Sequence, residues 1–108
     1  LIPALIQSGF ACEKFVFEGF LPRKKKKKRL EFLSTENRTI IIYESPYRLL
    51  KTLHDLNIYF QDRNIVVVKE LTKIYESTYR GNIKSVLADL ESANIKGEYI
   101  IVIQGFNN

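Results

Sequence analysis

The chain has 108 residues, 45% hydrophobic and 12% aromatic, so it is long and apolar enough to fold as one domain around a core. Its single cysteine, Cys12, excludes an internal disulfide, and one cysteine with one histidine leaves no zinc-ligand set. No apolar run approaches the roughly 20 residues of a transmembrane helix, and no secretory signal is visible. The cytosol is therefore the expected location.

The formal charge of +5 is concentrated in one segment. Seven basic residues are consecutive: Arg23, Lys24, Lys25, Lys26, Lys27, Lys28 and Arg29. Outside this basic run, ten basic residues stand against twelve acidic ones. A concentrated cationic run on an otherwise slightly acidic domain is typical of nucleic-acid binding. The alternative is a solvated loop without a ligand.

Strands and helices alternate along the predicted chain. Helices are expected over residues 4–8, 24–36, 46–60 and after Asn82, and strands over 15–17, 39–43, 64–69, 75–80 and 99–103. The short link between residues 69 and 75 indicates that the strands on either side are antiparallel neighbours. The expected fold is α/β (α+β), with a mixed sheet of about five strands flanked by helices.

An apolar pair precedes the basic run. Phe20 and Leu21 lie in a segment, Gly19–Pro22, that is expected to be a loop. They could form a lip for a ligand, or they could tuck into the core, which is the commoner fate of apolar residues.

The junction after residue 43 is the first candidate site. The β-branched residues 39–43 predict a buried strand, after which Ser45 is expected to cap a helix whose first residue is Pro46. Glu44, Tyr47 and Arg48 would then stand at the carboxyl end of a strand, where open α/β sheets bind ligands. An ordinary strand–helix junction is the alternative.

No Gly-rich nucleotide loop occurs in the sequence, neither a Walker lysine motif nor G-x-G-x-x-G. The chain begins at Leu1 and contains no methionine. Both features lead us to expect a piece of a longer protein, with part of any nucleotide site lying elsewhere.

Four blocks of sequence together resemble a known family. They are Phe17–Lys24 (FEGFLPRK), Tyr43–Arg48 (YESPYR), Glu70–Lys73 (ELTK) with Arg80-Gly81, and Lys96–Glu98 (KGE). In this order they resemble the carboxyl half of the ribosomal RNA small-subunit methyltransferase I family, within the tetrapyrrole-methylase-like superfamily. Tyr47 departs from the pattern, because many relatives are expected to carry histidine there.

This resemblance implies S-adenosylmethionine-dependent 2′-O-methylation of a cytidine in small-subunit rRNA. It also implies a homodimer of two-domain subunits with the cofactor between the domains. Residues 1–108 would be the carboxyl-terminal domain, inactive by itself because the Gly-rich domain is absent. The resemblance assigns five residues to the cofactor: Tyr43, Glu44, Gly97, Glu98 and Tyr99.

The remaining candidates are assigned to RNA. The basic run would hold phosphates without reading sequence, while Phe20 or Tyr47 could stack on an unpaired base. The RNA set is completed by Arg48, Glu70, Lys73 and Arg80. The first three are also candidates to assist the attacking hydroxyl. For these three, phosphate contact or a structural ion pair is the favoured role. No catalytic base and no metal site is assigned.

Two other functions remain open. A methyltransferase of the same superfamily could act on a tetrapyrrole or another small molecule, but such a substrate does not need so long a cationic strip. A non-catalytic, ribosome-associated RNA-binding module would account for the basic run without an enzyme, but it leaves the four motif blocks unexplained.

Overall fold

The computed structural model describes residues 4, 8–10, 13–71 and 74–106, with side chains described outside 70–77. Its elements are β1 (Phe15–Phe20), α2 (Lys26–Ser34), β2 (Thr39–Glu44), α3 (Leu49–Phe60), β3 (Asn64–Leu71), β4 (Ile74–Asn82), α4 (Ile83–Glu91) and β5 (Glu98–Ile103). The order of strands and helices is the predicted one from residue 15 onward. The helix expected over residues 4–8 falls mostly outside the described residues.

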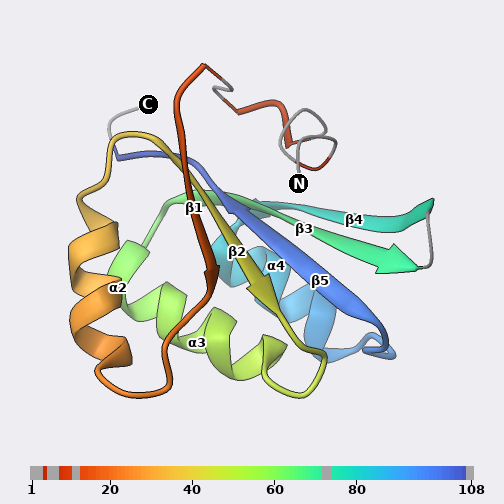
Figure 1. Cartoon of the computed structure of the whole chain (residues 1–108). Helices are drawn as coiled ribbons and strands as arrows, with labels where there is room; N and C mark the ends of the chain where they lie inside the picture. The colour runs from red at the N-terminus through yellow and green to blue at the C-terminus, as the bar shows by residue number, and fades with distance from the viewer. Residues whose placement is uncertain (1–3, 5–7, 11–12, 72–73, 107–108) are drawn as a thin grey trace.

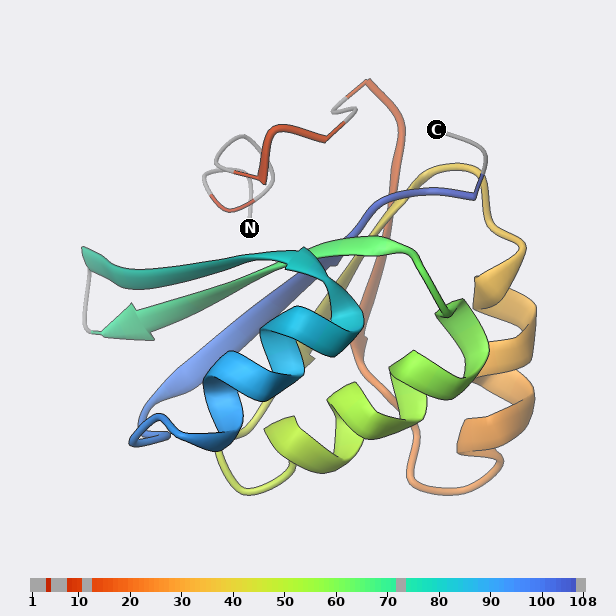
Figure 2. The same cartoon turned by 180° about the vertical axis from the view of Figure 1, so that it is seen from behind.

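The five strands form one mixed sheet in the order β1-β2-β5-β3-β4 (Figure 1). β1 and β2 are parallel, whereas β5 is antiparallel to both β2 and β3, so β1, β2 and β3 run in the same direction. β3 and β4 are antiparallel neighbours. Helices α2, α3 and α4 lie on one face of this sheet (Figure 2). The predicted α/β fold with a five-stranded mixed sheet is confirmed.

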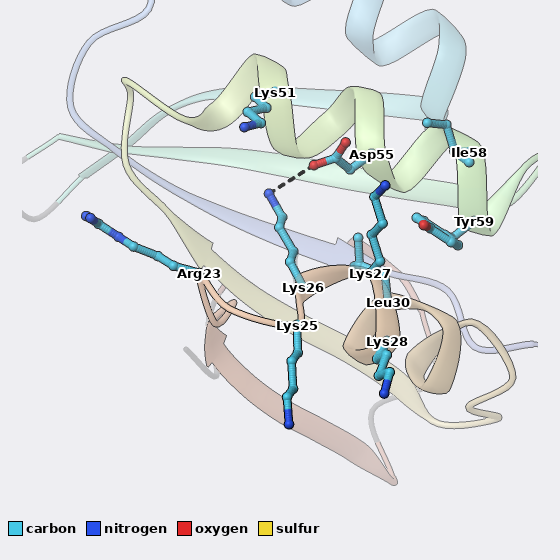
Figure 3. Close-up of a pocket in the computed structure, with 10 residues that line it drawn as sticks. All are labelled: Arg23, Lys25, Lys26, Lys27, Lys28, Leu30, Lys51, Asp55, Ile58 and Tyr59. Carbon is cyan, nitrogen blue, oxygen red and sulfur yellow. Dashed lines mark ion pairs between the residues drawn. The ribbon is translucent and has the colours of Figure 1, made fainter.

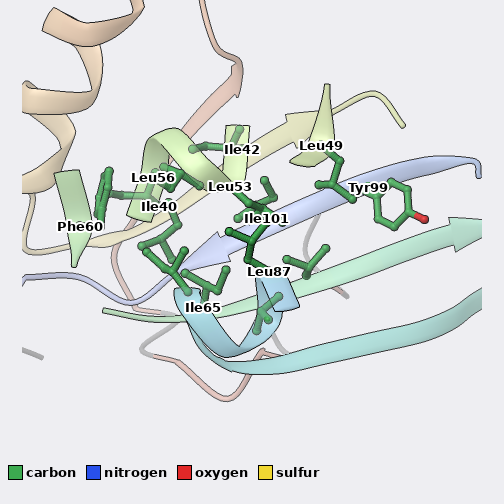
Figure 4. Packing of buried hydrophobic residues seen from close by; sticks show 14 of the residues in the cluster. Ile40, Ile42, Leu49, Leu53, Leu56, Phe60, Ile65, Leu87, Tyr99 and Ile101 are labelled. Carbon is green, nitrogen blue, oxygen red and sulfur yellow. The ribbon is translucent and has the colours of Figure 1, made fainter. Parts of the chain in front are cut away.

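The main core lies between the helices and one face of the sheet (Figure 4). In α3 the buried side chains are Leu49, Thr52, Leu53, Leu56 and Phe60; in α2 they are Leu30 and Leu33. They pack on inward-facing residues of β2, β3 and β5, such as Ile40, Ile65 and Ile101. The opposite face also buries apolar residues: Ile41, Val66, Val68, Ile100 and Val102. Burial on both faces explains why these strands read as continuous β-branched runs.

β1 is longer than predicted. Its residues pair in register with β2 up to Phe17, and then Glu18 is skipped, so that Gly19 and Phe20 lie opposite Ile42 and Tyr43. An extra residue in one strand reverses the face on which later side chains lie. The bulge therefore places Phe20 on the same face as Tyr43, while Leu21 is buried in the core. The apolar pair is split, and neither of the two fates considered for it applies to both residues.

The predicted start of the second long helix is wrong. α3 begins at Leu49, three residues after Pro46, and Arg48 occupies the N-cap position without a side-chain hydrogen bond. Instead, residues 45–48 form a turn in which the Arg48 N–H donates to the Ser45 carbonyl at 3.2 Å. Pro46 follows the first residue of that turn, a position that its fixed φ suits. Sequence alone could not separate this turn from a first helical turn, because serine followed by proline favours both.

Asn82 caps the amino end of α4. The Asn82 side-chain oxygen accepts from the Ser85 N–H at 2.8 Å, and Ile83, Val86, Leu87 and Leu90 are buried. We expect Asn82→Ala to lower the free energy of unfolding by about 1 kcal/mol, because one N–H of the first turn loses its acceptor. Denaturant unfolding measures this, with Ala88→Ser on the exposed part of the same helix as a control. A loss as small as that of the control would contradict the capping role.

A short ion pair sets the pKa of Glu36 just before β2. Arg38 donates to both carboxylate oxygens, at 2.9 and 3.0 Å, and these hydrogen bonds lower the pKa of Glu36 to about 2. A carboxyl group whose pKa is lower in the folded state stabilises the fold above its unfolded pKa, and the contribution is lost as the pH falls toward 2. In Arg38→Gln, NMR titration should give a higher pKa that still lies below the ordinary 4.5, because the backbone N–H of residue 38 keeps its hydrogen bond to Glu36. An unchanged low value would show that Arg38 is not the cause.

Candidate functional site

The carboxyl ends of β1 and β2 meet the beginning of β5. Tyr43 lies between Phe20 of β1 and Ile100 of β5, and Glu44 pairs with Tyr99. On the other side of β5, Glu98 pairs with Glu70, at the end of β3. Segments far apart in the sequence are therefore collected at one edge of the sheet, the edge at which such folds bind ligands.

A pocket of about 210 Å³ opens at this edge. It is lined by Phe20, Tyr43, Glu44, Glu98, Tyr99 and Ile100. Four of the five residues assigned to the cofactor thus line one pocket, and we call it the strand-end pocket. The fifth, Gly97, directly precedes Glu98 in a turn with φ +81°, a conformation that favours glycine. Phe20, which the sequence assigned to RNA, also lines this pocket.

Aromatic rings form one wall of the strand-end pocket. The Tyr43 ring contacts Phe20 edge-on, with ring centroids 5.7 Å apart, and contacts Phe17 similarly at 5.1 Å. Phe20 is 64% exposed and Phe17 49% exposed. Two large apolar side chains that remain open to solvent beside a pocket offer a surface for a flat, apolar group.

Glu44 is held rigidly by its neighbours. One carboxylate oxygen accepts from the Ser45 N–H at 2.9 Å, and the other accepts from the Thr52 hydroxyl at 2.6 Å. Thr52 in turn accepts from the Lys26 ammonium at 3.2 Å, and Lys26 also pairs with Asp55 at 3.1 Å. This chain of contacts ties the end of β2 to α3 and to the first turn of α2. These contacts fix the junction between β2 and α3, which Ser45 was expected to fix by capping the helix.

Tyr99 closes the inner side of the strand-end pocket. Its ring is 2% exposed and packs in the core cluster, and its hydroxyl accepts from the Lys96 N–H at 3.3 Å. Burial raises the pKa of the Tyr99 phenol above its ordinary value. The hydroxyl is therefore neutral at physiological pH and can act as a hydrogen-bond donor but not as a base.

A second, larger cleft lies between α2 and α3 (Figure 3). Its volume is about 440 Å³. The lining residues are Arg23, Lys25, Lys26, Lys27, Lys28, Leu30, Lys51, Asp55, Ile58 and Tyr59. Six of them are cationic and one is acidic, so we call it the basic cleft. The beginning of α2, which carries the lining residues Lys26, Lys27 and Lys28, lies at the same end of the molecule as the arrowheads of β1 and β2 (Figure 1).

The basic run is not a uniform strip. Lys26 is occupied by Asp55 and Thr52, and the Arg29 guanidinium donates two hydrogen bonds to Glu18, at 2.6 and 2.9 Å. Lys24 is exposed but is not among the residues that line the cleft. Two of the seven basic side chains therefore hold the fold together, and the helix itself begins only at Lys26.

The other residues assigned to RNA are dispersed. Tyr47 is 95% exposed in the turn before α3, and Arg48 is half-buried at the N-cap. Arg80 lies elsewhere: it belongs to β4 and pairs with Val66 of β3. Its guanidinium donates to the Ser8 carbonyl at 2.9 Å. Glu70 reaches the strand-end edge through its backbone, and Lys73 lies outside the described residues.

Sequence reasoning missed the α3 wall of the basic cleft. Lys51, Asp55 and Tyr59 are spaced four residues apart and so share one helix face, with Ile58 beside them. This spacing is visible in the sequence, but it points to the basic run only once α2 is known to pack beside α3.

Among the residues that the structure describes, no group of three or more histidine, cysteine, aspartate or glutamate side chains could hold a metal ion. Within the same residues, none of the helices has the length and apolar character needed to cross a bilayer.

Residues 4–87 match the family model for tetrapyrrole (corrin/porphyrin) methylases. The chain is 46% identical to the ribosomal RNA small subunit methyltransferase I of Synechocystis sp., over 97% of this chain and 39% of that protein. It is 41% identical to the protein of the same name from Thermotoga maritima (97% and 48% covered) and 45% identical to that of Bacillus subtilis (99% and 37%). The chain thus spans between about a third and a half of the length of these relatives.

Solved structures show the same fold. The cobalt precorrin-4 methyltransferase of cobalamin biosynthesis matches with a TM-score of 0.66 at 15% identity, over 94% of this chain and 46% of that one. The methyltransferase CobJ matches with a TM-score of 0.56 at 13% identity, over 86% and 41%. With the family model covering more than half of the chain, the sequence resemblance is confirmed: the chain belongs to the tetrapyrrole (corrin/porphyrin) methylase family.

Proposed function

We propose that the protein containing this chain transfers a methyl group from S-adenosylmethionine to the 2′-hydroxyl of a cytidine in small-subunit rRNA. The chain is its carboxyl-terminal domain, and it supplies one wall of the cofactor cleft and a surface for RNA. The observation that carries the proposal is that the beginning of α2, which supplies three lysines of the basic cleft, lies at the same end of the fold as the strand ends that line the strand-end pocket. The relatives named for rRNA methylation over nearly the whole chain support the choice of substrate.

The strand-end pocket fits part of such a cofactor. Adenine is flat and suits the exposed ring of Phe20 beside the half-buried Tyr43, and ribose hydroxyls are suited to a carboxylate such as that of Glu98. Its volume of about 210 Å³ is below the roughly 300–1,000 Å³ of complete small-molecule sites. Half of a site is what a cleft between two domains requires from either domain.

The chemistry needs alignment more than strong acid or base groups. The cofactor, when bound, supplies an electrophilic methyl group on a sulfonium, which a ribose hydroxyl attacks in line. Residues of this chain contribute by orientation: Tyr99 and Glu44 are fixed by the core and by Thr52, so the wall does not need to reorganise on binding. Arg48 is the N-cap residue of α3, four residues after Glu44 in the chain, and its charge would favour a partly deprotonated hydroxyl or a phosphate nearby.

The test is methyl transfer by the whole protein, as a homodimer, to small-subunit particles, to isolated rRNA and to a free tetrapyrrole, with radiolabelled cofactor. Binding of RNA and of the cofactor is measured in parallel. We expect labelled RNA whose modification maps to the 2′-oxygen of one cytidine. Label on a base would contradict the proposed chemistry. Label only on a tetrapyrrole would favour the small-molecule methyltransferase, and RNA binding without cofactor binding would favour the ribosome-associated module.

The 108-residue chain alone is expected to be inactive. It holds one wall of the cofactor cleft, so S-adenosylmethionine should bind it at least 100-fold more weakly than it binds the whole protein, a difference of about 2.7 kcal/mol. Isothermal titration of both proteins, with methyl transfer assayed in parallel, measures this. Turnover by the chain alone would overturn the shared-site arrangement.

A further inference from the structure

The basic cleft combines two kinds of surface. Lysine and arginine side chains surround its entrance, whereas Leu30, Ile58 and Tyr59 form an apolar floor. Ile58 is 66% exposed, which is unusual for an aliphatic side chain on a helix that is otherwise well packed. Tyr59 is half-buried and rests on the core cluster, so its ring is supported from behind. A site that binds only the sugar–phosphate backbone by charge does not need an apolar floor.

The lysines of the cleft point in different directions. In Figure 3, Lys26 and Lys27 extend toward α3, whereas Lys25 and Lys28 extend the opposite way. Lys25 lies in the left-handed region, with φ +59°, at the sharp turn that starts α2. The basic run is thereby divided into an inner pair, which faces α3, and an outer pair, which faces solvent.

The acidic side chain in the cleft does not repel an anion. The Asp55 carboxylate is 3.1 Å from the Lys26 ammonium, and this pair is largely buried. Lys27 on α2 and Lys51 on α3 therefore remain as cations on opposite walls of the cleft. Neither forms an ion pair with another of the described residues. Two opposed ammonium groups above an apolar floor fit a phosphate whose attached base lies below.

We propose that the basic cleft seats one unpaired nucleotide of the RNA, with its base against Tyr59 and Ile58 and its phosphate between Lys27 and Lys51. This rests on the proposed function and gives it a defined contact away from the methyl-transfer site. Single-stranded bases stack on aromatic side chains, whereas the bases of a duplex are already stacked and cannot enter such a floor. The cleft volume, about 440 Å³, is within the range of about 300–1,000 Å³ that small-molecule pockets occupy.

The experiment compares matched lysines. Binding of a short, mixed-sequence, single-stranded RNA to the 108-residue chain is measured for Lys27→Gln and Lys51→Gln, and for Lys25→Gln and Lys28→Gln. Each of the four substitutions removes one exposed positive charge. Lys27→Gln and Lys51→Gln should each weaken binding about threefold or more beyond Lys25→Gln and Lys28→Gln. Equal losses from all four would show that the charges act as a diffuse field, and would overturn the seated nucleotide while leaving RNA binding intact.

The base contact has its own test. Tyr59→Leu should weaken single-strand binding about fivefold or more, since a stacked base contributes about that much, while Tyr59→Phe should bind normally. Binding of a duplex of the same sequence should be unaffected by either change. As a second readout, thiouridine-labelled RNA should crosslink to the peptide that contains Ile58 and Tyr59.

Two outcomes would overturn the base contact. One is equal weakening of single-strand and duplex binding in Tyr59→Leu; the other is a crosslink that maps elsewhere. Thermal unfolding of each variant shows whether a loss of binding is only a loss of fold. If the unaltered chain and the unaltered whole protein both fail to bind RNA, the proposed function fails as well, and the two failures are thus distinguishable.

Discussion

Replacing Lys25, Lys27 and Lys28 together with glutamine is expected to weaken rRNA binding by the whole protein on the order of tenfold or more at physiological salt. Each lysine that neutralises a phosphate of a single strand contributes about 0.7 to the slope of log affinity against log salt. The slope should therefore fall by about 2 in magnitude. Lys26 is kept, because its ammonium holds Asp55 and Thr52 and its loss would disturb the fold.

The control for this variant removes the same charge elsewhere. Lys14, Lys84 and Lys96 are also exposed and do not line the basic cleft. Changed to glutamine, they should leave the salt slope nearly unaltered, and cofactor affinity should be unchanged in both triple variants. If the two triple variants lose affinity equally, RNA binding follows net charge and the cleft has no special part in it.

Thr52→Val is expected to lower the free energy of unfolding by about 1–3 kcal/mol, because the buried Glu44 carboxylate loses the hydroxyl donor at 2.6 Å. Glu44→Gln disturbs the same hydrogen bond from the other side and should have a similar cost. Denaturant unfolding of the 108-residue chain gives both values. A change below about 0.5 kcal/mol in both variants would mean that this contact adds little to stability.

The same two variants separate the structural role of Glu44 from a role in binding. Glu44 lines the strand-end pocket and Thr52 does not. For equal losses of stability, Glu44→Gln in the whole protein should weaken S-adenosylmethionine binding severalfold more than Thr52→Val. Equal weakening would make Glu44 a junction residue only, which is the ordinary reading of a strand end followed by a turn.

Periodicity in the sequence was enough to predict most of the architecture. The apolar faces of α2, α3 and α4 and the doubly buried strands β2, β3 and β5 follow from spacing and β-branching alone. These features depend on neighbours within a few residues, so a local pattern records them. The gathering of Tyr43, Glu44, Glu98 and Tyr99 in one pocket was predicted by resemblance, not by spacing.

Features that depend on distant contacts could not be predicted. The bulge at Glu18 shifts Phe20 to the Tyr43 face, and a bulge has no distinct signature in residues 15–20. The division of the basic run follows from Asp55, 29 residues after Lys26, and from Glu18, which takes Arg29. Charge counting treats these lysines and arginines as equivalent, whereas the fold gives two of them structural partners.

The proposed function requires two separate sites, a strand-end pocket for the cofactor and a basic cleft for RNA. Its most direct test is an NMR titration of the whole protein, first with S-adenosylmethionine and then with single-stranded RNA. The cofactor should shift the backbone amide signals of Tyr43, Glu98 and Ile100 and leave those of Lys27 and Ile58 in place, and RNA should then shift the second set. Cofactor shifts confined to the basic cleft, or none in the strand-end pocket, would contradict it.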